Sequence, residues 1–287
     1  MHTTKESMYG NFGVQAENYN KHRPPYEDAV FTHICNENNW KWKDGQTYFR
    51  FLDLGCGTGI STASLLRQIQ LRLPKNSTFE LIGLDKDEHM ISVAKQMVND
   101  KRVKFIVGEI TDDKVGRNFD LILCASAFHW ICKDEQSIRK IRSLLHGGLL
   151  GSGGRSPFVV VNRELASPDG FRKYQRRIVE SFSKEIIPDI KENYQPINIL
   201  LDYEFTLVSS IVLRVETKVT VEAFENSAKT VSAWGMIEDD KKPKAESKLR
   251  DYINIFSKDG VIEKADRYKI VFGYRYNNFP ETDIENN

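Results

Sequence analysis

Residues 53–59 read Asp53-Leu54-Gly55-Cys56-Gly57-Thr58-Gly59, and they stand between an apolar run and a helical pattern. The apolar run covers residues 51–54, and Ser61 and Thr62 open the helical pattern. Glycines allow a sharp backbone turn and let a ligand approach where a Cβ atom would collide. The stretch therefore predicts a strand, a loop and a helix that together bind a nucleotide-like cofactor. The alternative is a tight turn that binds no ligand.

The acidic residue before the glycines narrows the choice of cofactor. A dinucleotide-binding loop reads GxGxxG and holds phosphates at the helix N-terminus, whereas this loop reads GxGxG and follows Asp53. A carboxylate there repels a pyrophosphate but suits the ammonium group of an amino acid. S-adenosyl-L-methionine (SAM) carries such a group, so the loop favours SAM over NAD.

The chain around this loop alternates short apolar runs with helical stretches, a pattern typical of βαβ units in a parallel sheet covered on both faces. Amphipathic spacing predicts helices between the runs, with Met90 among the apolar positions of the second. The expected strands are 51–54, 80–84, 103–107, 121–124 and 158–162, and the expected helices are 61–73, 88–100 and 135–145.

The flanking segments predict a cap and further strands. Residues 18–35 pass through Tyr19 and Arg23 into a helical pattern, and 168–236 mix helices with a strand near 211–217. Residues 268–276 alternate as a final edge strand does, and the charged stretch 239–248 indicates a solvated loop or a helix start. We expect one domain over 1–287, with a core at about 45–165 and 205–276 and a cap at about 9–35 and 168–236. The glycine-rich stretch 146–157 has no assigned role.

Acidic residues follow the next two expected strands. Asp85 is placed to accept hydrogen bonds from ribose hydroxyls, although it could instead cap the following helix. Glu109 is placed to hold an adenine amino group while Ile110 packs on the ring, although Glu109 could be a solvated loop acid. Asp120 opens the fourth strand and is interpreted as structural. Residues 125–130 lie at the carboxyl edge of the sheet, where open α/β sheets bind ligands.

Together these motifs resemble the class I SAM-dependent methyltransferases from about Tyr19 to Asn162. The resemblance implies a Rossmann-like α/β fold with a seven-stranded, mostly parallel sheet, helices on both faces, an antiparallel last strand and a helical cap. Glu109 departs from the pattern, because many members have Asp there. The implied cofactor-binding residues are Asp53, Gly55, Cys56, Gly57, Asp85, Lys86, Met90, Glu109, Ile110, Ala125, Tyr19 and Arg23.

Within that class, the residues at 19–26, the pair His129-Trp130 and the stretch 227–234 resemble the trans-aconitate and juvenile-hormone-acid methyltransferases, which methylate carboxylates of small acids. We expect His129 to act in catalysis, as a positioning wall or as a general base. Trp130 and Trp234 are expected to contact the substrate, although most tryptophans pack in the core. Arg23 could bind an anionic group of substrate or cofactor, or only anchor its helix.

Composition limits the other possibilities. The net charge is +1, so no basic excess points to nucleic acid. The four cysteines are widely spaced and predict reduced thiols without a metal site. No segment approaches the roughly 20 apolar residues of a membrane span, which favours a cytoplasmic protein. The oligomeric state is not encoded in any motif.

The expected function is carboxyl O-methylation of a small organic acid, with a small-molecule acceptor and no nucleic-acid or membrane partner. Three alternatives remain open at the level of sequence. The acceptor atom could be the oxygen, nitrogen or carbon of another metabolite, for which a base such as His129 would matter more. The chain could bind SAM without methyl transfer, or it could methylate a macromolecule.

Overall fold

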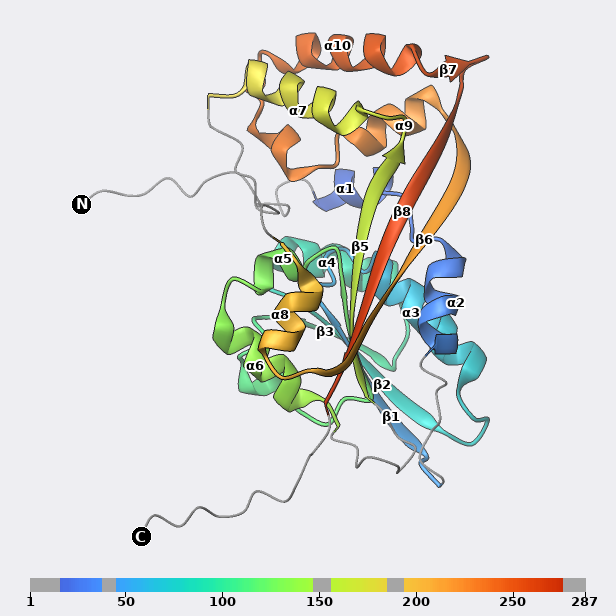
Figure 1. The fold of residues 1–287 in the computed structure, drawn as a ribbon, viewed down its shortest axis with the longest axis vertical. Coiled ribbons are helices and arrows are strands. Elements are labelled where there is room, and N and C mark those ends of the chain that lie inside the picture. Colours follow the sequence, from blue (N-terminus) through green and yellow to red (C-terminus); the bar gives the residue numbers. More distant parts are fainter. Residues whose placement is uncertain (1–15, 38–44, 147–155, 185–193, 276–287) are drawn as a thin grey trace, which may run out of the picture.

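The computed structural model describes residues 16–37, 45–146, 156–184 and 194–275. The strands form one sheet, and helices cover both of its faces. A helical cap lies above one end of the sheet (Figure 1). The parts of the expected cap before residue 16, most of the glycine-rich stretch 146–157 and the chain beyond 275 lie outside the described residues.

The sheet has eight strands in the order β3-β2-β1-β4-β5-β8-β6, and the short β7 pairs with β8. The first five are parallel, whereas β8 runs antiparallel to both β5 and β6. The expected seven strands are therefore present, and β7 adds a two-residue eighth. The strands are β1 (Tyr48–Leu54), β2 (Thr78–Asp85), β3 (Val103–Val107), β4 (Leu121–Ala125), β5 (Pro157–Ser167), β6 (Thr206–Thr220), β7 (Ser257–Lys258) and β8 (Val261–Tyr274).

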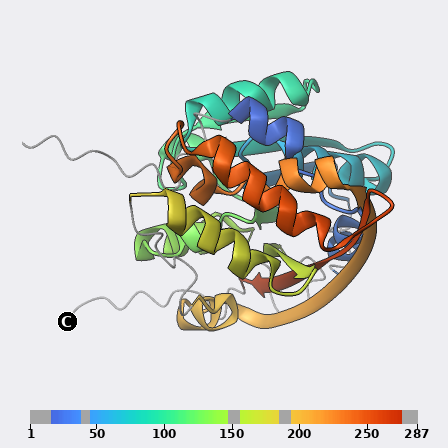
Figure 2. The same cartoon turned by 90° about the horizontal axis from the view of Figure 1, so that it is seen from above.

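The predicted edge position of the last strand is wrong. Residues 261–274 form an interior strand between β5 and β6, and β6 is the edge strand of the path. Figure 2 shows β6 curving around the outside of the molecule. The strand predicted near residues 211–217 is also longer than expected, because β6 covers Thr206–Thr220.

Two apolar clusters hold the helices to the two faces of the sheet. On one face, residues such as Phe31 of α2 and Leu65 of α3 pack against Phe51 and Val159. On the other face, Ile138 of α6 and Leu200 of α8 pack against the opposite side chains of the same strands. The helices are α1 (Ala16–His22), α2 (Asp28–Glu37), α3 (Ile60–Arg72), α4 (Glu88–Met97), α5 (Phe128–Ile131), α6 (Glu135–Leu144), α7 (Phe171–Phe182), α8 (Pro196–Asp202), α9 (Val221–Ala228) and α10 (Lys242–Asn254), with 3₁₀ turns η2 (Asp113–Val115) and η3 (Ser232–Met236).

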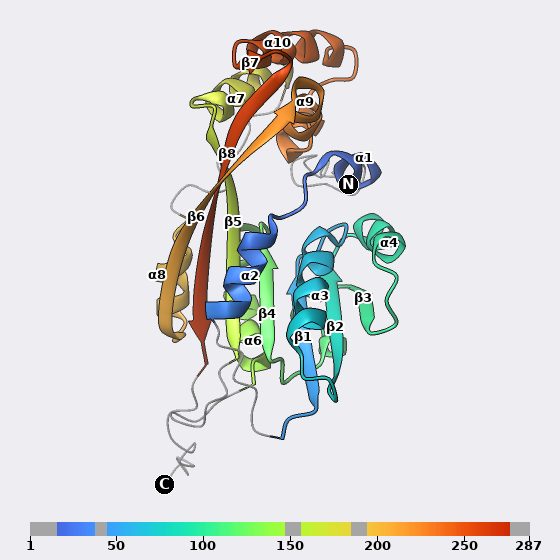
Figure 3. The same cartoon turned by 90° about the vertical axis from the view of Figure 1, so that its right-hand side faces the viewer.

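The cap is built from α7, α9, η3 and α10 around a third apolar cluster that includes Phe171, Trp234 and Leu249. The upper parts of β5, β6 and β8 run on into the cap, so the same strands belong to both layers (Figure 3). The charged stretch 239–248 contains the start of α10, one of its two predicted states. Helix α1 lies between the cap and the sheet edge and contacts both α4 and α9.

Candidate functional site

The glycine loop connects β1 to α3 at the carboxyl edge of the sheet, as the sequence predicts. The backbone N–H groups of Gly55 and Cys56 both donate to the carbonyl oxygen of Leu84, at 2.8 and 3.1 Å. These bonds fix the loop to the end of β2, where Asp85 follows directly. The loop and the predicted ribose acid are thereby held side by side.

Glycine is needed at the first two glycine positions of the loop for different physical reasons. Both have positive φ, 69° at Gly55 and 53° at Gly57, which is a backbone state that favours glycine. A Cβ atom at Gly55 would lie 2.4 Å from Cβ of Ala127, so packing against the protein excludes a side chain there. A Cβ atom at Gly57 would meet nothing within 4 Å. The space beside Gly57 is therefore open for a ligand.

Asp53 lies beneath this loop and is 0% exposed. Its Oδ2 atom accepts hydrogen bonds from the hydroxyls of Ser61 (2.7 Å) and Thr62 (2.6 Å). Burial raises the pKa of Asp53 to about 6; the hydrogen bonds from Thr62 and Ser61 oppose this rise, and the nearby Asp85 adds to it. The two hydroxyls that open α3 thus orient the carboxylate.

Two buried oxygens at the loop have no hydrogen-bond partner among the residues that the structure describes. They are Oδ1 of Asp53 and Oγ1 of Thr58. A buried acceptor without a donor costs free energy, which a ligand donor would recover. The amino-acid end of SAM carries an ammonium group that could donate to Asp53. The open space beside Gly57 leaves room for that end of the ligand.

Asp85 ends β2, and its two oxygens bond to the glycine loop and to the turn before α4. Its Oδ2 accepts from the N–H of Gly57 (2.9 Å), and its Oδ1 accepts from the N–H of Asp87 (3.0 Å). Burial raises its pKa, although these two backbone bonds oppose the rise. The alternative that Asp85 caps the following helix is wrong, because Asp87 is the N-cap of α4 and accepts from the N–H groups of His89 and Met90.

The residues predicted around the adenine end have contrasting environments. Glu109 is exposed, and its backbone N–H donates to Oδ2 of Asp112. Ile110 is buried in one of the two sheet clusters, and Lys86 is exposed. Their roles toward a cofactor stay predictions.

Helix α1 covers α4 next to the loop. Met90 and Val93 of α4 pack with Ala16 and Tyr19 of α1. The guanidinium carbon of Arg23 lies 5.6 Å from the centroid of the Tyr19 ring. The structure thus brings the predicted residues Tyr19, Arg23 and Met90 together on one side of the loop.

The segment 23–26 contacts the residue that follows β4 and the middle of β5. The hydroxyl of Tyr26 donates to Oγ of Ser126 (3.0 Å), and Ser126 follows the predicted residue Ala125 in a strained conformation with φ of 58°. Arg163 of β5 donates to the carbonyl oxygens of Pro24 and Pro25, at 2.9 and 3.3 Å. These contacts fix the segment that would face an acceptor.

His129 is buried on α5, close to the end of β4. Its ring centroid lies 5.3 Å from that of Trp130 and 5.9 Å from that of Tyr194. The hydroxyl of Tyr194 donates to Oδ1 of Asn162 at 3.4 Å, which links this aromatic group to β5. The geometry suits a wall that shapes an acceptor site.

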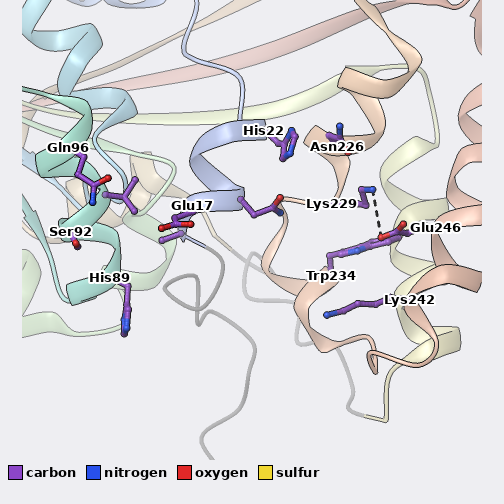
Figure 4. A pocket seen from close by; sticks show the side chains of 13 residues that line it. Glu17, His22, His89, Ser92, Gln96, Asn226, Lys229, Trp234, Lys242 and Glu246 are labelled. Carbon is purple, nitrogen blue, oxygen red and sulfur yellow. Dashed lines mark ion pairs between the residues drawn. The ribbon is translucent and has the colours of Figure 1, made fainter.

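A cavity of about 600 Å³ lies between α1, α4 and the cap (Figure 4). Trp234, predicted to bind substrate, lines this cavity and is otherwise buried in the cap cluster. Lys229 and Glu246 form an ion pair of 3.7 Å on its cap side. None of the glycine-loop residues lines the cavity.

Several side-chain pairings of this region carry no signal in the sequence. Tyr26 with Ser126, and Arg163 with the carboxylate of Asp266 (2.6 Å), join positions about 100 residues apart. Tyr194 follows a stretch without a readable pattern. The predicted structural role of Asp120 is visible, because its Oδ2 accepts from the N–H of Arg50 at 2.8 Å and ties β1 to β4.

Comparison with known proteins shows what this chain is similar to. A family described as "Methyltransferase domain" matches residues 47–155. The malonyl-[acyl-carrier protein] O-methyltransferase of Priestia megaterium is 30% identical over 192 residues, 63% of this chain and 65% of the relative. A second protein of that name from Ilyobacter polytropus is 24% identical over 206 residues, 66% of this chain and 75% of the relative. A solved structure from Anaeromyxobacter dehalogenans, described as a type II methyltransferase, has a TM-score of 0.59 at 16% identity and covers 88% of this chain and 97% of that chain.

Residues 47–155 therefore match a methyltransferase domain, and the chain is similar to methyltransferases over a longer stretch. The resemblance stated from the sequence is confirmed, as is the α/β fold class. The chain spans slightly less than two thirds of the Priestia relative. Among the residues that the structure describes, no group of three or more His, Cys, Asp or Glu side chains could hold a metal ion, and no helix is long and apolar enough to cross a bilayer.

Proposed function

We propose that this methyltransferase uses SAM and methylates a carboxylate of a small organic acid. The observation that carries the SAM assignment is the buried carboxylate of Asp53, one oxygen of which has no donor among the described residues, in a loop with open space at Gly57. The carboxylate as acceptor is supported by the names of the Priestia and Ilyobacter relatives, which are carboxyl O-methyltransferases of a malonyl group.

The residues of the loop would each hold one part of SAM. Asp53 would accept from the ammonium group, and Asp85 from the ribose hydroxyls. Glu109 would accept from the adenine amino group beside Ile110. Tyr19 and Met90 would close over the cofactor from α1 and α4, and Lys86 and Ala125 would border it. When bound, SAM supplies a methyl group on a positively charged sulfur, which any well-placed nucleophile can attack.

On the acceptor side, this chain would mainly position the acceptor and exclude water. A carboxylic acid with a pKa near 4 is already ionised at neutral pH, so it needs no general base. His129, Trp130 and Tyr194 would form the wall that orients the acceptor. Correct orientation alone can lower the barrier by several kcal/mol, on the order of 7–11 at best.

The cofactor assignment is tested by calorimetric titration of the protein with SAM and, separately, with NAD. We expect micromolar binding of SAM that is weakened at least tenfold by Asp53→Ala and by Asp85→Ala. The exposed Asp113 offers a matched control, since Asp113→Ala leaves the loop intact. Tighter binding of NAD than SAM, or SAM affinity unchanged in both loop variants, would remove the basis of this proposal.

The acceptor assignment is tested by following S-adenosylhomocysteine formation with a panel of small carboxylic acids and with malonyl thioesters, both free and attached to acyl carrier protein. The thioesters belong in the panel because the relatives' names specify a carrier-bound acceptor. In the His129→Gln variant we expect only a few-fold loss of rate with a carboxylate acceptor. A loss of a thousandfold would favour a hydroxyl, amine or carbon acceptor that needs a base. SAM binding without turnover over a broad panel would indicate a binding protein.

A further inference from the structure

Ser126 follows β4 directly and lies at the same edge of the sheet as the glycine loop. Strands β1 and β4 are parallel neighbours with Asp53 beside Leu123, so both leave the sheet at this edge. The two turns that follow them are in contact, because a Cβ atom at Gly55 would lie 2.4 Å from Cβ of Ala127. Distances within the protein therefore place Ser126 next to the glycine loop.

The backbone of Ser126 is held in a conformation that serine rarely adopts. Its φ of 58° lies in the left-handed region, which costs free energy for a residue with a side chain. Its N–H donates to the carbonyl oxygen of Val161 at 2.7 Å, so β5 fixes this turn. Strained residues of this kind are concentrated at active sites and ligand-binding turns, where the surrounding structure maintains them. The turn thereby sets the direction of the Cα–Cβ bond of Ser126.

Tyr26 fixes the side-chain hydroxyl of Ser126. Its phenolic O–H donates to Oγ of Ser126 at 3.0 Å. Burial raises the pKa of Tyr26 to about 12, so the phenol keeps its proton at neutral pH and remains a donor. The Tyr26 ring is held in turn by Phe31 and Tyr268, at centroid distances of 5.6 and 6.3 Å.

The Ser126 hydroxyl still has its own proton to donate. A serine hydroxyl has one O–H donor and two acceptor lone pairs, and Tyr26 uses one of the lone pairs. Among the residues that the structure describes, Ser126 Oγ donates to none. The side chain is half-buried, so a ligand at this edge of the sheet can reach the O–H.

The other residues of this turn cannot offer the same group. Ala125, Ala127 and Phe128 have apolar side chains, and His129 is buried. Within residues 125–129, Ser126 thus carries the one polar side chain that is not buried. The carboxyl edge of an open α/β sheet is where ligands bind, which makes this hydroxyl a candidate contact for the acceptor.

A carboxylate acceptor has a use for such a donor. It has two oxygens, and only one of them takes the methyl group. A hydrogen bond to the other oxygen orients the first, and a bond to an ionised carboxylate is shorter and stronger than one between neutral groups. No proton has to be removed from the acceptor, since a carboxylic acid is already ionised at neutral pH.

We propose that Ser126 binds the acceptor by donating its O–H to the carboxylate oxygen that does not take the methyl group. This inference rests on the proposed function for the identity of the acceptor as a carboxylate. Tyr26 is a positioning residue, because it acts on the acceptor only through the hydroxyl of Ser126.

The test measures binding rather than turnover. Protein saturated with S-adenosylhomocysteine is titrated with the carboxylic acids and malonyl thioesters of the panel above, and with the methyl ester of each. We expect at least one acid to bind, and Ser126→Gly to weaken its binding about tenfold. The affinity for the matching methyl ester, whose oxygens are uncharged, should change by less than about threefold. Glycine adopts a φ of 58° without strain, so the variant removes the hydroxyl and keeps the backbone.

Three further variants separate the hydroxyl from the turn that carries it. Tyr26→Phe leaves the Ser126 hydroxyl free to rotate and should lose a smaller part of the acid affinity. Ser126→Asn should retain part of it, because asparagine tolerates the left-handed region and carries a donor. Asn118→Gly is the matched control, an exposed residue with a φ of 62° ahead of β4, and should leave the acid affinity unaltered.

Two results would overturn the proposal. One is a Ser126→Gly variant that binds every acid as tightly as the unaltered protein does, or a panel in which no acid binds at all. The other is an equal loss for acid and methyl ester, or a loss of S-adenosylhomocysteine affinity, either of which would assign Ser126 to the fold or to the cofactor site. The proposed function fails separately, through the absence of SAM binding or of methyl transfer in the unaltered protein.

Discussion

At the scale of single residues, Asp53 joins stability to ligand binding. An unfolded aspartate titrates near pH 4, whereas burial, opposed by the bonds from Thr62 and Ser61, raises the pKa of Asp53 to about 6. Below about pH 4 both states are protonated, and Asp53 has no effect on stability. Between about pH 4 and pH 6 the unfolded state loses its proton first, so the free energy of unfolding falls, and above pH 6 the full decrease remains.

We therefore expect Asp53→Asn to raise the free energy of unfolding of the ligand-free protein at pH 7 by about 1–3 kcal/mol. The gain should shrink toward zero as pH falls to 4. Urea denaturation at four pH values measures it, with Asp113→Asn, an exposed change, as the control. A variant less stable than the unaltered protein at pH 7 would contradict the ionised, buried state of Asp53.

The two glycines predict opposite consequences of the same substitution. Gly55→Ala would drive a Cβ atom into Ala127, and we expect a loss of about 2–4 kcal/mol in the free energy of unfolding. Gly57→Ala meets only conformational strain, about 1 kcal/mol, but its Cβ would occupy the open space. Thermal denaturation with SAM titration separates them: SAM affinity should fall at least tenfold in Gly57→Ala. Equal destabilisation by both changes would contradict this reading of the loop.

At this scale, the sequence predicts contacts between residues that belong to local motifs, and it does not predict contacts between residues that are far apart along the chain. Asp53, Gly57 and Asp85 belong to motifs whose spacing is local, so the structure finds them together at one sheet edge. The contacts of Tyr26 with Ser126 and of Arg163 with Asp266 depend on strand register and on the cap. No periodicity in a single sequence encodes such pairs.

At the scale of elements, the hydrophobic pattern predicts that the strands exist, but it does not predict the position of β8 in the sheet. The apolar runs of β1 to β5 were predictable because these strands are covered on both faces. The alternating run at residues 268–276 predicted an edge strand, and β8 also carries Lys264, Asp266 and Arg267 among its apolar residues. Its neighbours instead satisfy these charges, through Arg163 on Asp266 and Glu164 on Arg267, so the strand is interior.

Asp266 is consequently the residue on which the junction of β5 and β8 depends. Burial opposes its ionisation, and Arg163 and Lys264 outweigh that effect and hold its pKa below the usual value. Asp266→Asn would leave two buried cations without a carboxylate, and we expect a loss of about 3–5 kcal/mol at pH 7. Glu263→Gln, on the exposed Lys218 pair of the same strand, should change stability by less than about 0.5 kcal/mol. Denaturant titration of both variants checks these values. A loss in Asp266→Asn as small as that in Glu263→Gln would contradict the prediction.

At the scale of the whole molecule, the cap and the sheet share their strands. Because β5, β6 and β8 run from the sheet into the cap, the cap cannot unfold without breaking the ladders that complete the sheet. We expect native-state hydrogen exchange to show backbone amides of α7 and α10 opening within about 1 kcal/mol of those of β1. Opening of the cap helices at several kcal/mol lower free energy would indicate a separately folding unit.

The position of β8 also has a consequence for biosynthesis. The chain is made from its amino end, and among the strands that the structure describes, the one that separates β5 from β6 is synthesised last. While the ribosome is still adding residues 221–260, β5 and β6 each present an unpaired row of backbone groups, and neither can take the other as its final neighbour. The nascent chain is then open to pairing with other chains. Its yield in the cell should depend on how quickly translation passes this interval and on chaperones that cover the two edges until residue 274 has emerged.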